Sequence, residues 1–134
     1  MSFTTKLGDE FLKVPKLDAS GKDWPLWKGR LELSLSARGL MGHLTGTVSK
    51  PTNPADGKSA GWSPSSADKI KAVQTYEKEL AEWLEKDAVV KQQIAVMLLD
   101  SLFVKLLSKP TAKDYYDTLK AQFEQWSLVI SVEL

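Results

Sequence analysis

The sequence predicts an all-α protein: a compact bundle of four to five helices with one long loop at about residues 47–66. Two observations lead to this fold class. Apolar side chains recur every three or four residues in three separate segments, and this spacing places them on one face of a helix. Residues 47–66 interrupt the periodicity with three prolines, two glycines and five serines, a composition typical of a loop.

A length of 134 residues is typical of one domain, and a composition of 43% hydrophobic and 26% charged residues is typical of a globular protein. The chain has no cysteine, which excludes disulfides, thiol nucleophiles and cysteine-based zinc sites. A formal net charge of +1 indicates neither a nucleic-acid nor a membrane partner. Because no secretion signal is recognisable and no apolar run approaches the roughly 20 residues of a membrane span, a cytoplasmic location is expected.

Residues 1–22 are expected to form an N-terminal arm, because Pro15 interrupts regular structure there. The first helix should begin near Asp23, ahead of a proline that is tolerated in the first turn. Leu26 and Leu33 lie on a different side from its main apolar face, which indicates that the helix is covered on two flanks. The main face holds Trp24, Trp27, Leu31 and Leu35.

A longer helix should begin after Ser65 or Ser66, because either residue can cap it. Its apolar stripe runs from residue 70 to residue 97 in steps of three and four. Asp87 is the one charge on this stripe. It marks either a break where a new helix is capped or a polar notch in one continuous helix, and continuity is favoured. Residues 98–107 are almost entirely apolar and are expected to be buried on most sides.

The last clear helix is expected in "TAKDYYDTLKAQF", with Thr111 as the N-cap and Asp114 placed as in a capping box. Residues 126–134 alternate in hydrophobicity as a strand does, but the chain offers no second strand to pair with. This tail is therefore expected to begin another helix, to dock on the bundle or to be truncated. The predicted organisation is an arm, a helical domain over residues 23–125 and a tail of uncertain structure over residues 126–134.

No catalytic, cofactor or metal site is predicted, and the chain is not expected to be an enzyme. His43 is the only histidine, and its neighbours in "LMGHLTG" supply neither an orienting acid nor a nucleophile, so a turn or capping role is expected. One histidine, no cysteine and scattered acids do not predict a metal site. Glycine patterns that bind phosphate are absent as well.

Lys28, Arg30 and Arg38 on the first helix form a candidate RNA contact, which would be weak and would weaken further with salt. The favoured alternative is a solvated helix face whose charge is balanced by Asp23 and Glu32.

The tryptophans divide into two groups by their sequence surroundings. Trp24 and Trp27 lie on a stripe that continues into leucines, and Trp83 lies midway along the long stripe, so all three are expected in the core and not in an aromatic cage. Trp62 stands alone in the polar loop and is a candidate for a surface contact.

Three sequence blocks resemble, in order, the N-terminal capsid region of the Gag polyprotein of copia-type LTR retrotransposons. They are "LDASGKDWPLW" with the following "GRLELSLSARGLMGHLTGT", then "WLEKDAVVKQQIAVMLLDSL", then "TAKDYYDTLKAQF". The resemblance covers about residues 14–125. The core residues that it implies as a family signature are Leu17, Trp24, Trp27, Leu31, Trp83, Ile94, Leu102, Tyr115, Leu119 and Phe123.

The resemblance implies a retroviral-capsid-like helical domain that needs no cofactor. Such a domain would self-associate into homo-oligomers or virus-like particles that package RNA. This chain departs from the family pattern in several ways. It lacks the cysteine-histidine zinc knuckle and the protease, integrase and polymerase segments, the tail "SLVISVEL" does not obviously continue the family's later helices, and the loop at residues 47–66 is longer than usual. A host-retained derivative therefore remains open, as does a non-assembling Gag-derived adaptor that binds another Gag or a host protein through a helical surface.

Overall fold

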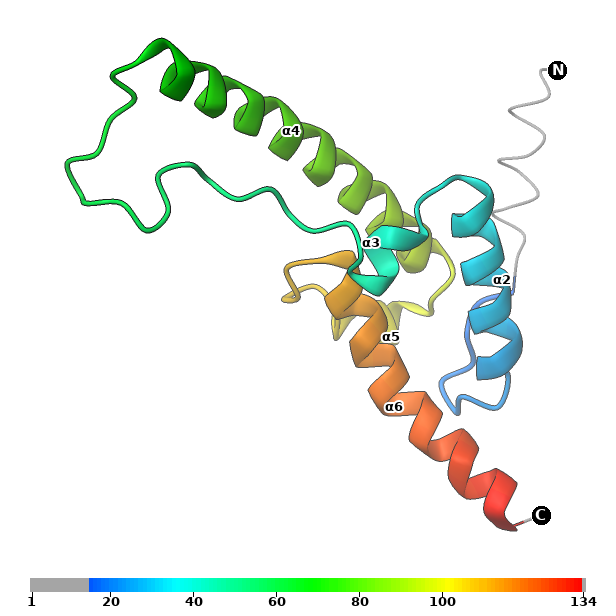
Figure 1. The fold of residues 1–134 in the computed structure, drawn as a ribbon. Helices are drawn as coiled ribbons and strands as arrows, with labels where there is room; N and C mark the ends of the chain where they lie inside the picture. The colour runs from blue at the N-terminus through cyan, green and yellow to red at the C-terminus, as the bar shows by residue number, and fades with distance from the viewer. Residues whose placement is uncertain (1–14, 134) are drawn as a thin grey trace, which may run out of the picture.

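The computed structural model describes the backbone of residues 15–133 and the side chains of residues 15–124. Within this part the chain forms helices and no strand of a sheet, which confirms the predicted all-α fold class (Figure 1). The helices are α2 (Trp24–Ala37), α3 (Met41–Thr45), α4 (Ala67–Val96), α5 (Asp100–Val104) and α6 (Ala112–Glu133). The greater part of the predicted N-terminal arm, residues 1–14, lies outside the described residues.

One end of α4 belongs to the bundle and the other projects from it. Helices α2, α3 and α6 pack together with the C-terminal part of α4, whereas the N-terminal part of α4 extends away from them (Figure 1). The loop at residues 47–66 is confirmed, and it runs beside this projecting part on its way back to the start of α4. The core therefore lies at one end of the molecule.

Helix α2 buries the face that its sequence predicts. Trp24, Trp27 and their leucine partners on the stripe are buried, and Pro25 occupies the first turn. Leu26 and Leu33, however, are 57% and 72% exposed. The expectation that α2 is covered on two flanks is wrong, because the helix lies on the outside of the bundle and contacts it along one face only (Figure 1).

Helix α4 is continuous through Asp87, as favoured from the sequence, and Ser66 caps it by accepting a hydrogen bond from the Lys69 amide. Its stripe is buried only over the last ten residues, at Asp87, Val90 and Ile94. The earlier stripe positions lie where α4 has left the bundle, and they are exposed or half-buried: Ile70, Val73, Tyr76, Leu80 and Trp83. Periodicity predicted the face of the helix but not the length over which it is covered.

The apolar run at residues 98–107 is buried on one side only. Leu98, Leu102 and Leu106 recur every four residues and are buried. The expectation that this run is buried on most sides is wrong, because α5 is a single short turn on the surface of the bundle. The apolar side chains left exposed are Leu99, Val104 and Leu107.

Helix α6 begins as the sequence predicts and ends later than expected. The Thr111 hydroxyl accepts a hydrogen bond from the Asp114 amide at 3.1 Å and donates one to the Asp114 carboxylate at 2.7 Å. The backbone of residues 126–133 then continues the same helix, so the alternating pattern of the tail does not form a strand. Extending an existing helix needs no new nucleus, whereas a lone strand has no partner for its backbone.

One backbone carbonyl ties the N-terminal segment and α2 to the end of α4. The Met97 carbonyl oxygen accepts a hydrogen bond from the Leu17 amide at 2.9 Å and another from the Trp27 indole at 2.8 Å. Leu17 and Leu98 form an isolated parallel bridge at this point. Both hydrogen bonds are long-range in sequence, so they form only when the bundle is assembled.

Two glycines beside or within α2 are expected to respond to alanine in opposite directions. Gly21 has a φ of +76°, and an added Cβ would overlap with the ring of Phe123. We expect Gly21→Ala to lower the free energy of unfolding by about 2 to 3 kcal/mol, from backbone strain together with overpacking. Gly29 is helical with open space around it, so Gly29→Ala should raise stability by about 0.8 kcal/mol. Urea denaturation measures both, and equal effects of the two substitutions would contradict the placement of Gly21.

Candidate interaction surfaces

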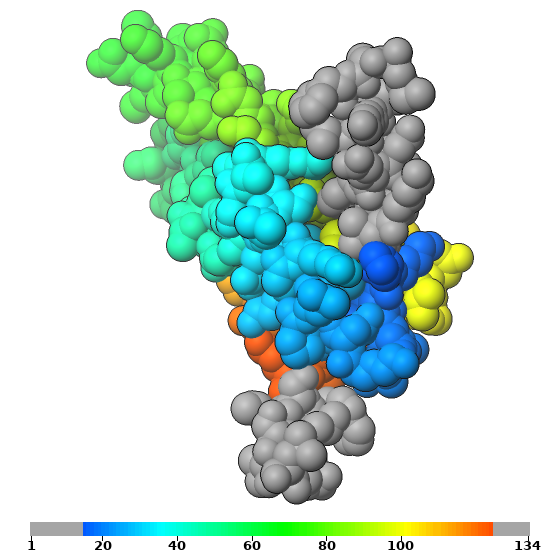
Figure 2. Space-filling view, turned by 90° about the vertical axis from the view of Figure 1, so that its right-hand side faces the viewer, coloured from blue at the N-terminus to red at the C-terminus, as the bar shows by residue number. Residues whose placement is uncertain are grey.

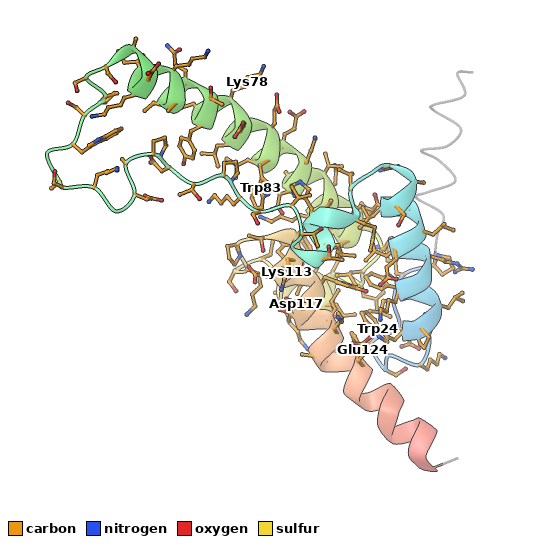
Figure 3. All side chains as sticks on the ribbon, viewed as in Figure 1. Trp24, Lys78, Trp83, Lys113, Asp117 and Glu124 are labelled. Atoms are coloured by element: carbon orange, nitrogen blue, oxygen red, sulfur yellow. The ribbon has the colours of Figure 1, made fainter. Side chains whose placement is uncertain are left out.

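The tryptophan pair at the start of α2 belongs to a packed ring cluster. The Trp24 ring stacks on Trp27 with centroids 5.4 Å apart and on Phe123 of α6 at 5.7 Å, and Tyr116 lies at 6.3 Å. Trp24 is only 1% exposed and lies between α2 and α6 (Figure 3). The rings contact one another and do not surround a ligand space. The pair is therefore core, as predicted, and not an aromatic cage.

Nine of the ten family-signature residues are buried and belong to the hydrophobic core, and Trp83 is the exception. The nine come from the N-terminal segment, α2, α4, α5 and α6, so the core joins segments from both ends of the described chain. They are Leu17, Trp24, Trp27, Leu31, Ile94, Leu102, Tyr115, Leu119 and Phe123.

Trp83 lies at the point where α4 leaves the bundle, and the prediction that it is a core residue is wrong. Its side chain is half-buried and its indole N–H donates to the Val48 carbonyl at 3.0 Å. The Lys50 ammonium lies 6.0 Å from the centre of its ring, near the outer limit of a cation–π contact. Trp83 therefore holds the start of the long loop against α4, with its ring directed toward that loop (Figure 3).

Two hollows of about 230 and 270 Å³ adjoin this contact. Both are lined by His43, Val48, Ser49 and Trp83. Further along, one includes acidic side chains of α4 and the other includes Lys113 of α6. Each is smaller than the roughly 300 Å³ at which small-molecule sites usually begin.

Asp87 and His43 meet in a buried polar junction between α3, α4 and α6. Both Asp87 oxygens accept from the Ala112 amide at the start of α6, at 3.1 and 3.3 Å, and the Lys91 ammonium lies 3.5 Å away. The His43 Nδ1 atom lies 3.7 Å from Asp87 Oδ1, beyond hydrogen-bond length. His43 lies in the last turn of the short helix α3, and its buried ring packs against Trp83 of α4, with the two ring centroids 5.2 Å apart.

Sequence reasoning missed this junction because its two central residues are far apart in the chain. The signal that existed was Asp87 itself, a single charge on an otherwise apolar stripe. A charge at such a position is stable only when hydrogen bonds or an opposite charge compensate for the loss of water. Here the start of α6 supplies both a donor and the positive end of the helix dipole. Asp87 is therefore a structural residue that joins α4 to the start of α6.

The three basic residues proposed for RNA contact have different surroundings. The Lys28 ammonium pairs with Glu124 of α6 at 2.7 Å, and the Arg38 guanidinium donates to Gln93 of α4 at 3.0 Å. Arg30 is exposed. Lys28 is therefore balanced by an acid on another helix, and not by Asp23 or Glu32 as predicted.

The two acids expected to balance the basic face serve other contacts. Asp23 accepts a hydrogen bond from the Asp18 amide at 3.2 Å, and Glu32 accepts one from the Tyr116 hydroxyl. Burial raises the pKa of Tyr116 above its ordinary value, and the hydrogen bond to Glu32 raises it further. Asp23 thus holds the turn before α2, whereas Glu32 links α2 to α6.

No protein family, curated protein or solved structure matches this chain. The likeness to copia-type Gag proteins therefore stays a prediction from the three sequence blocks. No helix in the described part of the chain combines the length and the apolar character needed to cross a membrane. Among the described residues, no group of three or more His, Asp or Glu side chains is placed to hold a metal ion.

Large apolar side chains are exposed on several outer surfaces of residues 15–124. Leu26 and Leu33 form a pair on α2, which lies across the face turned to the viewer in Figure 2. On α4, Ile70 and Leu84 are exposed singly, about four helical turns apart. A second pair, Val104 and Leu107, lies at and after α5. Trp62, the predicted surface contact, is half-buried in the loop.

Proposed function

We propose that this chain is a structural protein, the capsid-type domain of a copia-like Gag protein or of a host-retained derivative, and that it acts by self-association. The observation that carries the proposal is the display of large apolar side chains on separate outer surfaces, around a core that is already closed. Leu33 illustrates this best, because it is 72% exposed on a helix whose opposite face is fully packed. The order of the three sequence blocks supports the choice of family.

Several small surfaces favour repeated contacts between copies over one strong contact. Burying one leucine or isoleucine contributes about 1.5 to 3 kcal/mol, and association first has to offset the loss of translational and rotational freedom. A single pair of exposed side chains therefore forms a weak joint. Surfaces on α2, α4 and α5 lie on different parts of the molecule, so one copy can contact more than one neighbour (Figure 1). Such joints add up when each copy has several neighbours.

RNA packaging is part of the proposed function, with only a weak contribution from this domain. Lys28 and Arg38 already contact Glu124 and Gln93, so an RNA phosphate would compete with contacts within the chain. The net charge of +1 supplies little long-range attraction. RNA would then be held through the many copies of an assembly rather than by one domain.

We expect the average mass of the protein in solution to rise with its concentration and to depend on salt. Light scattering coupled to size exclusion measures this, and negative-stain microscopy detects particles. Leu33→Ser should weaken association without lowering stability, because an exposed side chain contributes little to folding. Ala37→Ser is the matched control at an exposed position of the same helix.

A protein that stays monomeric at every concentration and salt condition would contradict self-association. One stoichiometric partner captured by such a monomer would instead support the adaptor hypothesis.

A further inference from the structure

One side of the projecting part of α4 carries a continuous apolar stripe that is half-buried. Val73, Tyr76, Leu80 and Trp83 follow one another in steps of three, four and three residues, so they lie on one side of the helix. These four are half-buried, whereas every other residue from 67 to 86 is exposed. Another segment must therefore cover the stripe where α4 has left the bundle.

The long loop is the segment that covers it. Helix α3 reaches Trp83 through the His43 ring, but no other described helix extends along the projecting part, and the loop runs beside it (Figure 1). Pro51 of the loop lines the same hollow as Trp83. Trp83 is directed toward the loop, whereas Lys78 is directed away from it (Figure 3). We call residues 49–62 of the loop the strap. Its half-buried residues are all apolar: Pro51, Pro54, Ala55 and Trp62.

Both ends of the strap are fixed to helices. Just before it, the Val48 amide donates to the Gly42 carbonyl of α3 at 3.2 Å, and the Val48 carbonyl accepts from the Trp83 indole at 3.0 Å. Beyond the strap, Ser66 caps α4. These hydrogen bonds lie outside residues 49–62, so they can persist whether or not the strap lies on the stripe.

Between these ends, apolar contact holds the strap on α4. The backbone hydrogen bonds within the strap close local turns, with the amides of Asp56, Lys58 and Trp62 as donors. Among the described residues, no hydrogen bond or ion pair joins residues 49–62 to α4, and the Lys50 ammonium lies 6.0 Å from the centre of the Trp83 ring. Lifting the strap therefore breaks no hydrogen bond to α4 and mainly exposes apolar surface to water.

We propose that the strap lifts from the stripe as one unit while the bundle and both ends of the strap stay in place. The buried core contains no residue of the strap. Segments held by few apolar contacts open at a lower free energy than a core does. Opening uncovers Val73, Tyr76 and Leu80, and it changes the surface of the projecting part without unfolding the bundle. The inference concerns a single copy and does not depend on self-association.

A pair of spin labels reports the position of the strap, because the chain has no cysteine that would have to be removed. Ser59→Cys on the strap and Lys78→Cys on α4 both replace exposed side chains. Pulsed electron paramagnetic resonance on labelled protein diluted with unlabelled protein should give a narrow distance distribution for the closed strap and a broad one for the open strap.

Leu80→Ser should raise the ratio of open to closed strap about tenfold, because it places a hydroxyl where the stripe needs an apolar side chain. The relative areas of the broad and narrow distributions give this ratio. Leu84→Ser is the matched control. It changes the same residue type one turn further along α4, at a side chain that is 48% exposed, and should leave the ratio unchanged.

Urea titration of the labelled pair without either serine substitution gives an independent readout. The narrow distribution should disappear at a lower urea concentration than the helical circular dichroism of the bundle. If the two losses coincide, the strap belongs to the cooperative unit of the bundle and the inference is wrong. It is also wrong if Leu80→Ser leaves the ratio unchanged or if Leu84→Ser changes it equally. None of these results bears on self-association, which light scattering tests separately.

Discussion

Replacement of Trp24 by alanine is expected to lower the free energy of unfolding by about 4 kcal/mol. The indole ring is 1% exposed and contacts three other rings from α2 and α6, so its removal leaves a cavity at the centre of the core. The bundle cannot close this space without moving α6 toward α2. Urea or thermal denaturation followed by circular dichroism measures the loss.

Trp83→Ala is the matched control, because it removes the same side chain from a half-buried position. It should cost no more than about half as much, since part of the ring already contacts water and the loop that it holds can rearrange. Equal losses at the two positions would contradict the division between a core tryptophan and a peripheral one. A larger loss for Trp83 would show that the junction of α4 with the loop carries the stability of the fold.

Replacement of Asp87 by alanine is expected to lower stability by about 3 kcal/mol. The substitution removes the acceptor for the Ala112 amide, a buried donor at the start of α6. It also removes the negative charge beside Lys91 and the neighbour of the buried His43 ring. Asp87→Asn should be intermediate, because it keeps an acceptor but not the charge. Chemical denaturation of the wild type and of both variants gives the two losses.

Asp117→Ala tests whether burial is the reason that losing the Asp87 carboxylate lowers stability so much. Asp117 also pairs with a lysine four residues away, Lys113, but both side chains are about half exposed. The hydrogen bond to Asp117 raises the pKa of Lys113, yet water screens this exposed pair, so its loss should lower stability much less than the loss of Asp87. If the two alanine variants are equally destabilised, the buried junction does not hold α6 in place.

The sequence alone was sufficient for the features that depend on neighbours along the chain. The caps at Ser66 and Thr111, the buried face of α2 and the continuity of α4 each follow from residues within a few turns. Helix boundaries and faces are local properties, because the backbone hydrogen bonds and the 3.6-residue period connect only nearby residues. The same reasoning placed Trp24 correctly in the core.

Only the tertiary structure decided which of the apolar faces are covered. Steps of three and four residues place Ile70, Trp83 and Ile94 on one apolar stripe along α4, but they do not state where a neighbouring helix ends. The bundle covers Ile94, the loop partly covers Trp83, and Ile70 stays exposed. In the same way, the sequence did not link Asp87 to His43 or to the start of α6. These residues are far apart in the chain and come together only in the folded protein. A face is buried when another segment reaches it in space, and that is a property of the whole fold.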